Sequence, residues 1–280
     1  MINYCKDFLR GKCKYDEKCK FTHEENICFH FMYKTCKYGD KCTKTHIKNK
    51  RKKNTECFVP LDEEKSPIDL RIVTNNIHAT ELFNKKITKR DLILIDNLFP
   101  EFDKWYIHDN ILEELELFRL NNPEKQLYKK WHGSEALKID GCHYIADDKL
   151  DWKKNCETFN FVVDRLSKYF NMRVEASRLN WYKDSSEWKP FHHDSAYINP
   201  DKAKVQNFTV AVSFGSNREA ALEHSITYTR VKLPITSGSV YCFSNDTNSI
   251  WRHGILQNKE ECERNGSRIS IILWGWVEMM

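Results

Sequence analysis

The chain is organised around the segment from Arg178 to Asp194, which reads RLNWYKDSSEWKPFHHD. The segment contains two residue pairs with a spacing of two: Asn180 with Tyr182, in a predicted β-strand, and His192 with Asp194. Alternate residues of a strand point to the same side, so the second pair would present an imidazole and a carboxylate toward one point. Such a pair can bind a metal ion.

Two later segments complete this candidate site. The best third ligand is His253, in SIWRHGI, because two histidines and one carboxylate on one side of a metal are typical of non-haem Fe(II) oxygenases. Arg268 opens the apolar segment RISIILWGWV, where a buried guanidinium would be costly unless it met an anion. We expect this anion to be the distal carboxylate of 2-oxoglutarate. His193 is a rival ligand to His192, but adjacent strand residues face opposite ways.

From about Asp91 to Val277, the chain resembles the AlkB family of Fe(II)- and 2-oxoglutarate-dependent dioxygenases. The family pattern is N-x-Y, then H-x-D, a distant H followed by G, and a downstream R, and all occur here in this order. The resemblance implies O2 as a further co-substrate. It implies that three side chains bind Fe(II) and act in catalysis: His192, Asp194 and His253. It implies that four others contact 2-oxoglutarate: Asn180, Tyr182, Arg268 and Ser270.

The same resemblance implies a double-stranded β-helix, or jelly roll, and the residue pattern agrees with it. Four later segments are rich in β-branched and aromatic residues between turn residues, which predicts strands: 208–215, 224–233, 239–244 and 268–277. Residues 91–99 are predicted as a buried strand and residues 105–120 and 156–170 as helices. We therefore expect a mostly β fold with flanking helices (α+β), preceded by two small zinc-stabilised modules.

Two departures from the family pattern keep several functions open. Trp274 stands where the family has a second arginine, which would hold the metal-proximal end of 2-oxoglutarate. After Asp194, the residues SAY replace the acidic run of the DNA-repair members. The candidate functions are an oxidative demethylase or hydroxylase of RNA or another nucleic acid, an oxygenase of a protein side chain, and an RNA-binding protein whose jelly roll has lost turnover.

The N-terminal residues repeat the spacing C-x7-C-x5-C-x3-H. Three thiolates and one imidazole complete a closed tetrahedral Zn site, and segments this short need the metal for stability. The first set of ligands is Cys5, Cys13, Cys19 and His23, and the second set is Cys28, Cys36, Cys42 and His46. The pattern resembles tandem CCCH zinc fingers. This resemblance implies two structural Zn ions and binding of single-stranded RNA or another nucleic acid.

Aromatic side chains in such fingers stack on bases, although some of them pack the small finger cores and a protein-binding role stays open. The stacking candidates here are Tyr15, Phe21 and Tyr38. Lys44 occupies the position in the second finger that matches Phe21, which weakens stacking there. The segment KKWHG resembles the nucleotide-covering lid of the AlkB family, with a plain surface loop as the alternative. Its candidate contacts are Lys129, Lys130 and Trp131.

Charge and composition set the domain organisation. Residues 1–58 contain 15 Lys+Arg and 7 Asp+Glu, a net charge of +8, whereas the whole chain carries +5. A basic module suggests an anionic polymer as partner. We expect two fingers at residues 1–24 and 25–47, a basic flexible linker at 48–75, and the oxygenase domain at 76–280. The oligomeric state is not predicted.

The composition also indicates the cellular compartment in which the protein is found. The cysteines of the repeated pattern suit a reducing compartment, and we find neither a membrane-spanning run nor the apolar core of a secretory signal. We therefore expect no membrane association and an intracellular protein, in the nucleus, the cytoplasm or both. We interpret the basic run KNKRKK, residues 48–53, as a nuclear import signal, a further phosphate contact or a spacer.

Overall fold

The computed structural model divides the chain into two compact units, Met1–Lys53 and Asn54–Met280. The residues that the structure describes are 5, 8–15, 18–19, 22–28, 38, 41–46, 57–58, 69–75, 82–131, 142–257 and 262–279.

Regular structure is sparse in the described part of the N-terminal unit. It comprises the 3-10 helix η1, Phe8–Arg10, and one parallel bridge between Ile27 and Thr45. Few side chains are buried there, among them those of Ile27 and Cys28.

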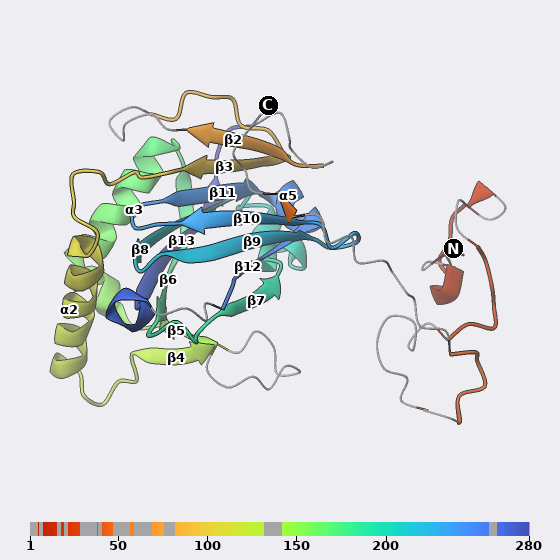
Figure 1. Ribbon diagram of the computed structural model, residues 1–280, viewed down its shortest axis with the longest axis horizontal. Helices are drawn as coiled ribbons and strands as arrows, with labels where there is room; N and C mark the ends of the chain where they lie inside the picture. Colours follow the sequence, from red (N-terminus) through yellow and green to blue (C-terminus); the bar gives the residue numbers. More distant parts are fainter. Residues whose placement is uncertain are drawn as a thin grey trace. The chain divides into compact units, whose positions relative to one another are not determined.

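Two packed β-sheets form the second unit (Figure 1). The larger sheet has the order β2-β3-β11-β8-β13-β6-β5-β4, and the smaller sheet has the order β1-β10-β9-β12-β7. The strands of the larger sheet are β2 Arg71–Asn75, β3 Asp91–Ile95, β4 Tyr128–Trp131, β5 His143–Ala146, β6 Arg173–Tyr182, β8 Phe208–Gly215, β11 Val240–Ser244 and β13 Arg268–Trp276. Those of the smaller sheet are β1 Cys57–Phe58, β7 Lys189–His192, β9 Arg218–His224, β10 Arg230–Ile235 and β12 Trp251–Ile255.

Apolar side chains fill two layers. One core lies between the two sheets and includes Leu222, Tyr241 and Ile255. The other lies between the larger sheet and two helices, α2 Tyr106–Asn121 and α3 Glu157–Tyr169, which Figure 1 shows beside that sheet. The mostly β fold with few helices is therefore confirmed, and it is consistent with a jelly roll.

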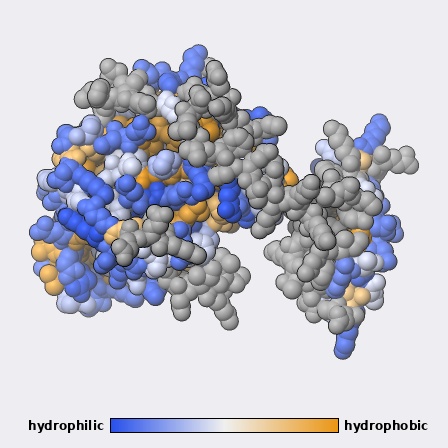
Figure 2. Space-filling view, in the orientation of Figure 1, coloured by the Kyte–Doolittle hydropathy of each residue, from blue (hydrophilic) through white to orange (hydrophobic). Residues whose placement is uncertain are grey.

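Short helices join the strands near the sheet ends. They are η5 Asp151–Asn155, η6 Ser195–Tyr197, α4 Pro200–Ala203, α5 Asn245–Ile250 and η7 Glu263–Gly266. Figure 2 shows a described surface that is largely hydrophilic, with hydrophobic residues emerging over the strands. Among the described helices, none has the length and apolar character that crossing a membrane requires.

The predicted strand at 224–233 is wrong. β9 ends at His224 and β10 begins at Arg230, because the His224 ring closes a turn between them. Its Nδ1 accepts the backbone N–H groups of Ile226 and Thr227, at 3.3 and 3.0 Å. A ring that satisfies two consecutive backbone donors favours a turn over a continued strand.

The range 48–75, expected to be a linker, contains two strands. β1 pairs in parallel with β10, and β2 pairs in parallel with β3 over its whole length. Sheet structure therefore begins before residue 76. Short strands at sheet edges are difficult to recognise in a sequence, since each is stabilised by one neighbour that lies far along the chain.

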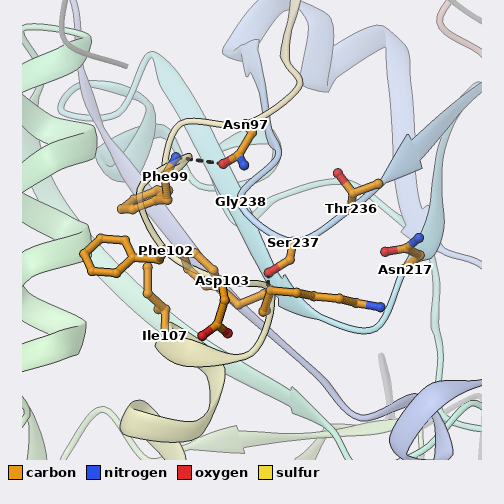
Figure 3. Close-up of a pocket in the computed structure, with 11 residues that line it drawn as sticks. Asn97, Phe99, Phe102, Asp103, Ile107, Asn217, Thr236, Ser237 and Gly238 are labelled. Atoms are coloured by element: carbon orange, nitrogen blue, oxygen red, sulfur yellow. Dashed lines mark hydrogen bonds between the residues drawn. The ribbon is translucent and has the colours of Figure 1, made fainter. Parts of the chain in front are cut away.

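A tight turn at Gly238 joins β10 of the smaller sheet to β11 of the larger sheet. Gly238 has φ +84°, and a Cβ there would lie 2.0 Å from Oδ1 of Asn97, the atom that accepts the backbone N–H of Phe99 at 2.8 Å. Figure 3 shows these residues around a hollow of about 200 Å³. The hollow contains none of the predicted site residues.

We expect Gly238→Ala to lower the free energy of unfolding by about 1–3 kcal/mol, because it combines a left-handed backbone with a steric clash. Thermal or denaturant unfolding measures the change. Asn217→Ala alters an exposed side chain of the same hollow, and its stability should stay near that of the wild type. Equal stability of the two variants would contradict the strain argument.

Candidate metal and co-substrate site

Three predicted ligands come together at the end of the smaller sheet. Antiparallel pairing of β7 with β12 places His192 directly opposite His253, with ring centroids 4.2 Å apart. Asp194 follows β7 by two residues, and its Oδ1 lies 4.0 Å from His192 Nε2 and 3.5 Å from His253 Nε2. The ligand atoms of all three residues lie within 4.8 Å of one another.

The two imidazoles are suited to bind a cation. Nδ1 of His192 donates to the carbonyl of Pro190 at 2.9 Å, which leaves Nε2 as the lone-pair nitrogen facing Asp194. Burial lowers the pKa of His192 well below its usual range and that of His253 to about 4. Both rings are therefore neutral at physiological pH. Two neutral nitrogens and one carboxylate oxygen on one side of an ion fit Fe(II).

His193, the rival ligand, is bound elsewhere. Its Nδ1 contacts the carbonyl oxygen of Asn248 in α5, and its ring stacks on Tyr197 with the centroids 4.2 Å apart. It does not belong to the group of three ligand residues. The adjacent histidines thus have different partners, as strand alternation predicts.

Neighbouring side chains fix the orientation of the Asp194 carboxylate. Its Oδ2 accepts hydrogen bonds from Thr209 Oγ1 at 3.0 Å and from Trp274 Nε1 at 2.9 Å. Its backbone N–H donates to Asn248 Oδ1 at 2.8 Å. Oδ1 therefore faces the two histidines. Trp274, which stands at the position of the second arginine in the family pattern, is an uncharged side chain that donates a hydrogen bond to the Asp194 carboxylate.

We expect Trp274→Phe to weaken metal binding about 10–100-fold, the usual effect of losing a hydrogen bond to a ligand side chain. The phenyl ring keeps most of the packing but has no N–H for Asp194. Calorimetric titration with Mn(II) measures the change without turnover. An unchanged affinity would show that Thr209 alone orients the carboxylate.

The four residues predicted to contact 2-oxoglutarate share one face of the larger sheet. β6 pairs with β13 so that Tyr182 lies opposite Arg268 and Asn180 lies opposite Ser270. Asn180 Nδ2 donates to Ser270 Oγ at 3.2 Å. His143, on β5, contacts Asn180 Oδ1 through its Nε2 at 3.3 Å.

Arg268 has donors available for a ligand. It is 1% exposed, and one guanidinium nitrogen, Nη2, donates to Ser213 Oγ at 2.6 Å. Its Nε and Nη1, and the hydroxyl of Tyr182, are buried and have no hydrogen-bond partner among the described residues. Such orphaned donors are costly unless a ligand accepts from them. A planar guanidinium with two unsatisfied nitrogens fits a carboxylate.

A cavity of about 380 Å³ lies beside the metal ligands. Trp131, at the end of β4, lines it, and its ring centroid is 5.5 Å from that of His192. Lys129 is exposed and paired with Asp147 at 2.6 Å. Lys130 alternates with Trp131 along β4 and has its Nζ 5.9 Å from the Tyr144 ring. Of the KKWHG candidates, Trp131 is therefore the one at the cavity.

The predicted zinc ligands also form groups. The ligand atoms of the first set, Cys5, Cys13, Cys19 and His23, lie within 4.8 Å of one another, as do those of Cys28, Cys42 and His46. Cys36 and Phe21 lie outside the described residues. The Phe8 ring stacks on His23 at 4.0 Å, so it packs against this group of ligands, whereas Tyr15 and Tyr38 are exposed. In the part of the chain that the structure describes, His23 Nε2 is buried without a hydrogen-bond partner, which fits a metal ligand.

Sequence reasoning missed several side chains of this site. Thr209 and Asn248 hold Asp194, Ser213 holds Arg268, and Lys189 lines the cavity. Their residue types are common, and the three hydrogen bonds join residues that are 15, 54 and 55 positions apart in the sequence. His143, in the segment GCHY, gave no spacing signal to any other ligand.

Two histidines and a carboxylate beside an arginine with unsatisfied donors define a non-haem iron site that binds an anionic co-substrate. The family model described as "2OG-Fe(II) oxygenase superfamily" matches residues 103–273, more than half of the chain. The chain belongs to this superfamily. Its members' chemistry makes it an oxidoreductase with Fe(II), 2-oxoglutarate and O2.

Many solved structures are similar to this chain. Among them is the crystal structure of an oxidoreductase of the 2OG-Fe(II) oxygenase family from Burkholderia pseudomallei. It is similar over 65% of this chain and 82% of that chain, with 12% identity and a TM-score of 0.38. No curated protein matches the sequence.

Proposed function

We propose that this protein is an AlkB-like dioxygenase that oxidises a base of single-stranded RNA, with the RNA held by the N-terminal CCCH fingers. The observation that carries this proposal is the Trp131 ring beside His192 in the cavity next to the metal ligands. A flat aromatic surface next to the reacting centre suits a nucleobase, because every base can stack on it.

The charges of the chain support a polyanionic substrate. The N-terminal unit is strongly basic, with a net charge of +8 over residues 1–58, and its exposed tyrosines, Tyr15 and Tyr38, suit base stacking. In the second unit, Arg178 and Lys189 line the cavity. A base can enter such a cavity only from a single strand or after extrusion from a duplex.

The reaction that we propose consumes one O2 and one 2-oxoglutarate per methyl group. Fe(II), when bound, supplies the activation of O2. One oxygen atom enters succinate as CO2 is released, and the other converts N–CH3 to N–CH2OH, which breaks down to formaldehyde and N–H. The protein orients the co-substrate and the base and excludes water from the site. Arg268 and Tyr182 hold the co-substrate, and Trp131 holds the base.

The test is formaldehyde release by the Fe(II)-loaded full chain from N-methylated single-stranded RNA, compared with a methylated peptide. We expect release from RNA alone, and we expect Trp131→Ala to raise KM for RNA about 5–150-fold, as loss of one stacking contact does. Uncoupled succinate formation without RNA should not change in this variant. Release from the peptide alone would contradict the RNA proposal and favour a protein substrate.

Zinc removal tests the role assigned to the fingers. A chelator that strips zinc should abolish binding of single-stranded RNA to the N-terminal unit, because the metal stabilises each finger. Fluorescence anisotropy with a labelled oligonucleotide measures this. Unchanged RNA binding after zinc loss, verified by metal analysis, would show that the fingers do not hold the RNA.

A further inference from the structure

Lys189 is a buried lysine whose ammonium has no anionic partner among the described residues. Its side chain is 93% buried, since the residue is 7% exposed, and it makes no hydrogen bond or ion pair with any residue that the structure describes. Its nearest described ring is that of Trp131, whose centroid lies 5.0 Å from the ammonium. An unpaired buried charge is costly, so a site that keeps one is suited to an anionic ligand.

An irregularity in the smaller sheet turns Lys189 toward the site. Lys189 and His192 are three residues apart, so regular alternation would send them to opposite faces. On the neighbouring strand their partners, Ile255 and His253, are only two residues apart, which marks a β-bulge in β7. Bulges near active sites re-aim side chains. Here the bulge puts Lys189 on the same face as His192.

The residues around the bulge favour it. Pro190 follows Lys189 and has no N–H to donate to a ladder, which suits an irregular position. Gly254 lies opposite, and a Cβ there would come within 2.7 Å of the Lys189 carbonyl oxygen. The chain thus combines a proline and a glycine where β7 and β12 approach closely.

Lys189 lines the same cavity as the metal ligands His192 and Asp194. The charges of Asp194 and Arg268 both act on Lys189, and its own charge lowers the pKa of His192 and of His143. Burial lowers the pKa of Lys189 to about 8, so the side chain remains mostly protonated at neutral pH and binding of an anion would stabilise this form. Trp274, the side chain next to Asp194, adds no charge.

We infer that Lys189 is the second cation of the 2-oxo acid site and pairs with the carboxylate on the metal side, while Arg268 pairs with the distal carboxylate. This inference rests on the proposed function for its co-substrate but does not need an RNA substrate. It also explains how the site can lack a second arginine on β13. Two fixed cations at opposite ends of a dicarboxylate would set both its position and its direction.

Binding of two acids of equal chain length tests this assignment. 2-Oxoglutarate carries both carboxylates, and 2-oxopentanoate lacks the distal one. Titration calorimetry on the Mn(II)-loaded full chain, without RNA, measures each affinity. We expect Lys189→Met to weaken both acids by about tenfold or more, the effect of removing one partner of a desolvated pair. Arg268→Met should weaken 2-oxoglutarate alone.

Control variants distinguish an effect of losing the Lys189 charge from an effect of disturbing the fold. Lys232→Met removes a half-buried lysine of β10 that pairs with Glu219, and it should bind both acids as the wild type does. Lys189→Met is expected to fold, because it replaces an unpaired buried ammonium by an apolar chain of similar length. Lys189→Gln, which keeps a polar end, provides a second variant without the charge, and melting temperatures check both.

Three outcomes would overturn the inference. Unchanged binding of both acids by the Lys189 variants would show that Lys189 does not contact the co-substrate. Weakening of 2-oxoglutarate alone would assign Lys189 to the distal carboxylate. Intact binding of both acids with weaker RNA binding would assign it to a phosphate of the substrate. If wild-type protein binds neither acid, the proposed function fails as well, so the two failures are distinguishable.

Discussion

His192→Ala is expected to reduce Fe(II)-dependent conversion of 2-oxoglutarate to succinate to background. The imidazole supplies one of three ligand atoms that lie within 4.8 Å of one another, and the described residues nearby offer no replacement nitrogen in the same position. With two ligands, the site would no longer hold the ion in one geometry. Succinate formation and iron content per protein chain are the two measurements.

The adjacent histidine is the matched control. His193 has the same residue type and similar burial, but its Nδ1 contacts the carbonyl of Asn248 instead of facing Asp194. We expect His193→Ala to keep the iron content of the wild type, although its stability can fall because α5 loses a contact. Loss of iron in His193→Ala but not in His192→Ala would reverse the ligand assignment.

Arg268→Met is expected to weaken 2-oxoglutarate binding about 30-fold or more. A carboxylate that loses its buried cation loses roughly 2–5 kcal/mol of binding free energy, and Arg268 has two unsatisfied nitrogens at this place. Arg268→Lys should recover only part of the affinity, because an ammonium cannot make two parallel hydrogen bonds. Titration of the Mn(II)-loaded protein with 2-oxoglutarate measures the affinity of the wild type and of both variants.

The stability of the same variant provides an independent check. Without ligand, Arg268→Met removes a buried charge whose only described hydrogen bond is to Ser213. We therefore expect the melting temperature of the free protein to stay level or rise, while the stabilisation by added 2-oxoglutarate shrinks. A large fall in the melting temperature of the free protein would show that Arg268 mainly supports the fold.

Local patterns in the chain were enough to predict much of the site. Asn180 and Tyr182 alternate along β6, His192 and Asp194 are two residues apart in the sequence, and the predicted helices lie within about two residues of α2 and α3. The repeated C-x7-C-x5-C-x3-H spacing is also local. Such features depend on the periodicity and spacing of residue types over a short segment, which the amino-acid sequence shows directly.

Contacts between distant strands could not be predicted in the same way. The turn at His224 was missed because its ring closes it by hydrogen bonds that compete with the strand pattern. β1 and β2 were assigned to a linker because their pairing partners lie elsewhere in the chain. The roles of Thr209 and Asn248 likewise depend on strand and helix packing.

The primary structure thus specifies which chemical groups are present and how they alternate: two imidazoles, a carboxylate, an apolar strand that begins with arginine, and two sets of thiolates. Folding specifies which of them meet. The register of β7 against β12 selects His192 over His193, and the bulge between these strands brings in Lys189. The packing of β13 brings Trp274 within hydrogen-bond distance of Asp194, and its Nε1 donates to the carboxylate. The physical reason is that register and bulges are settled by pairing across the sheet, where a shift of one residue reverses every side chain.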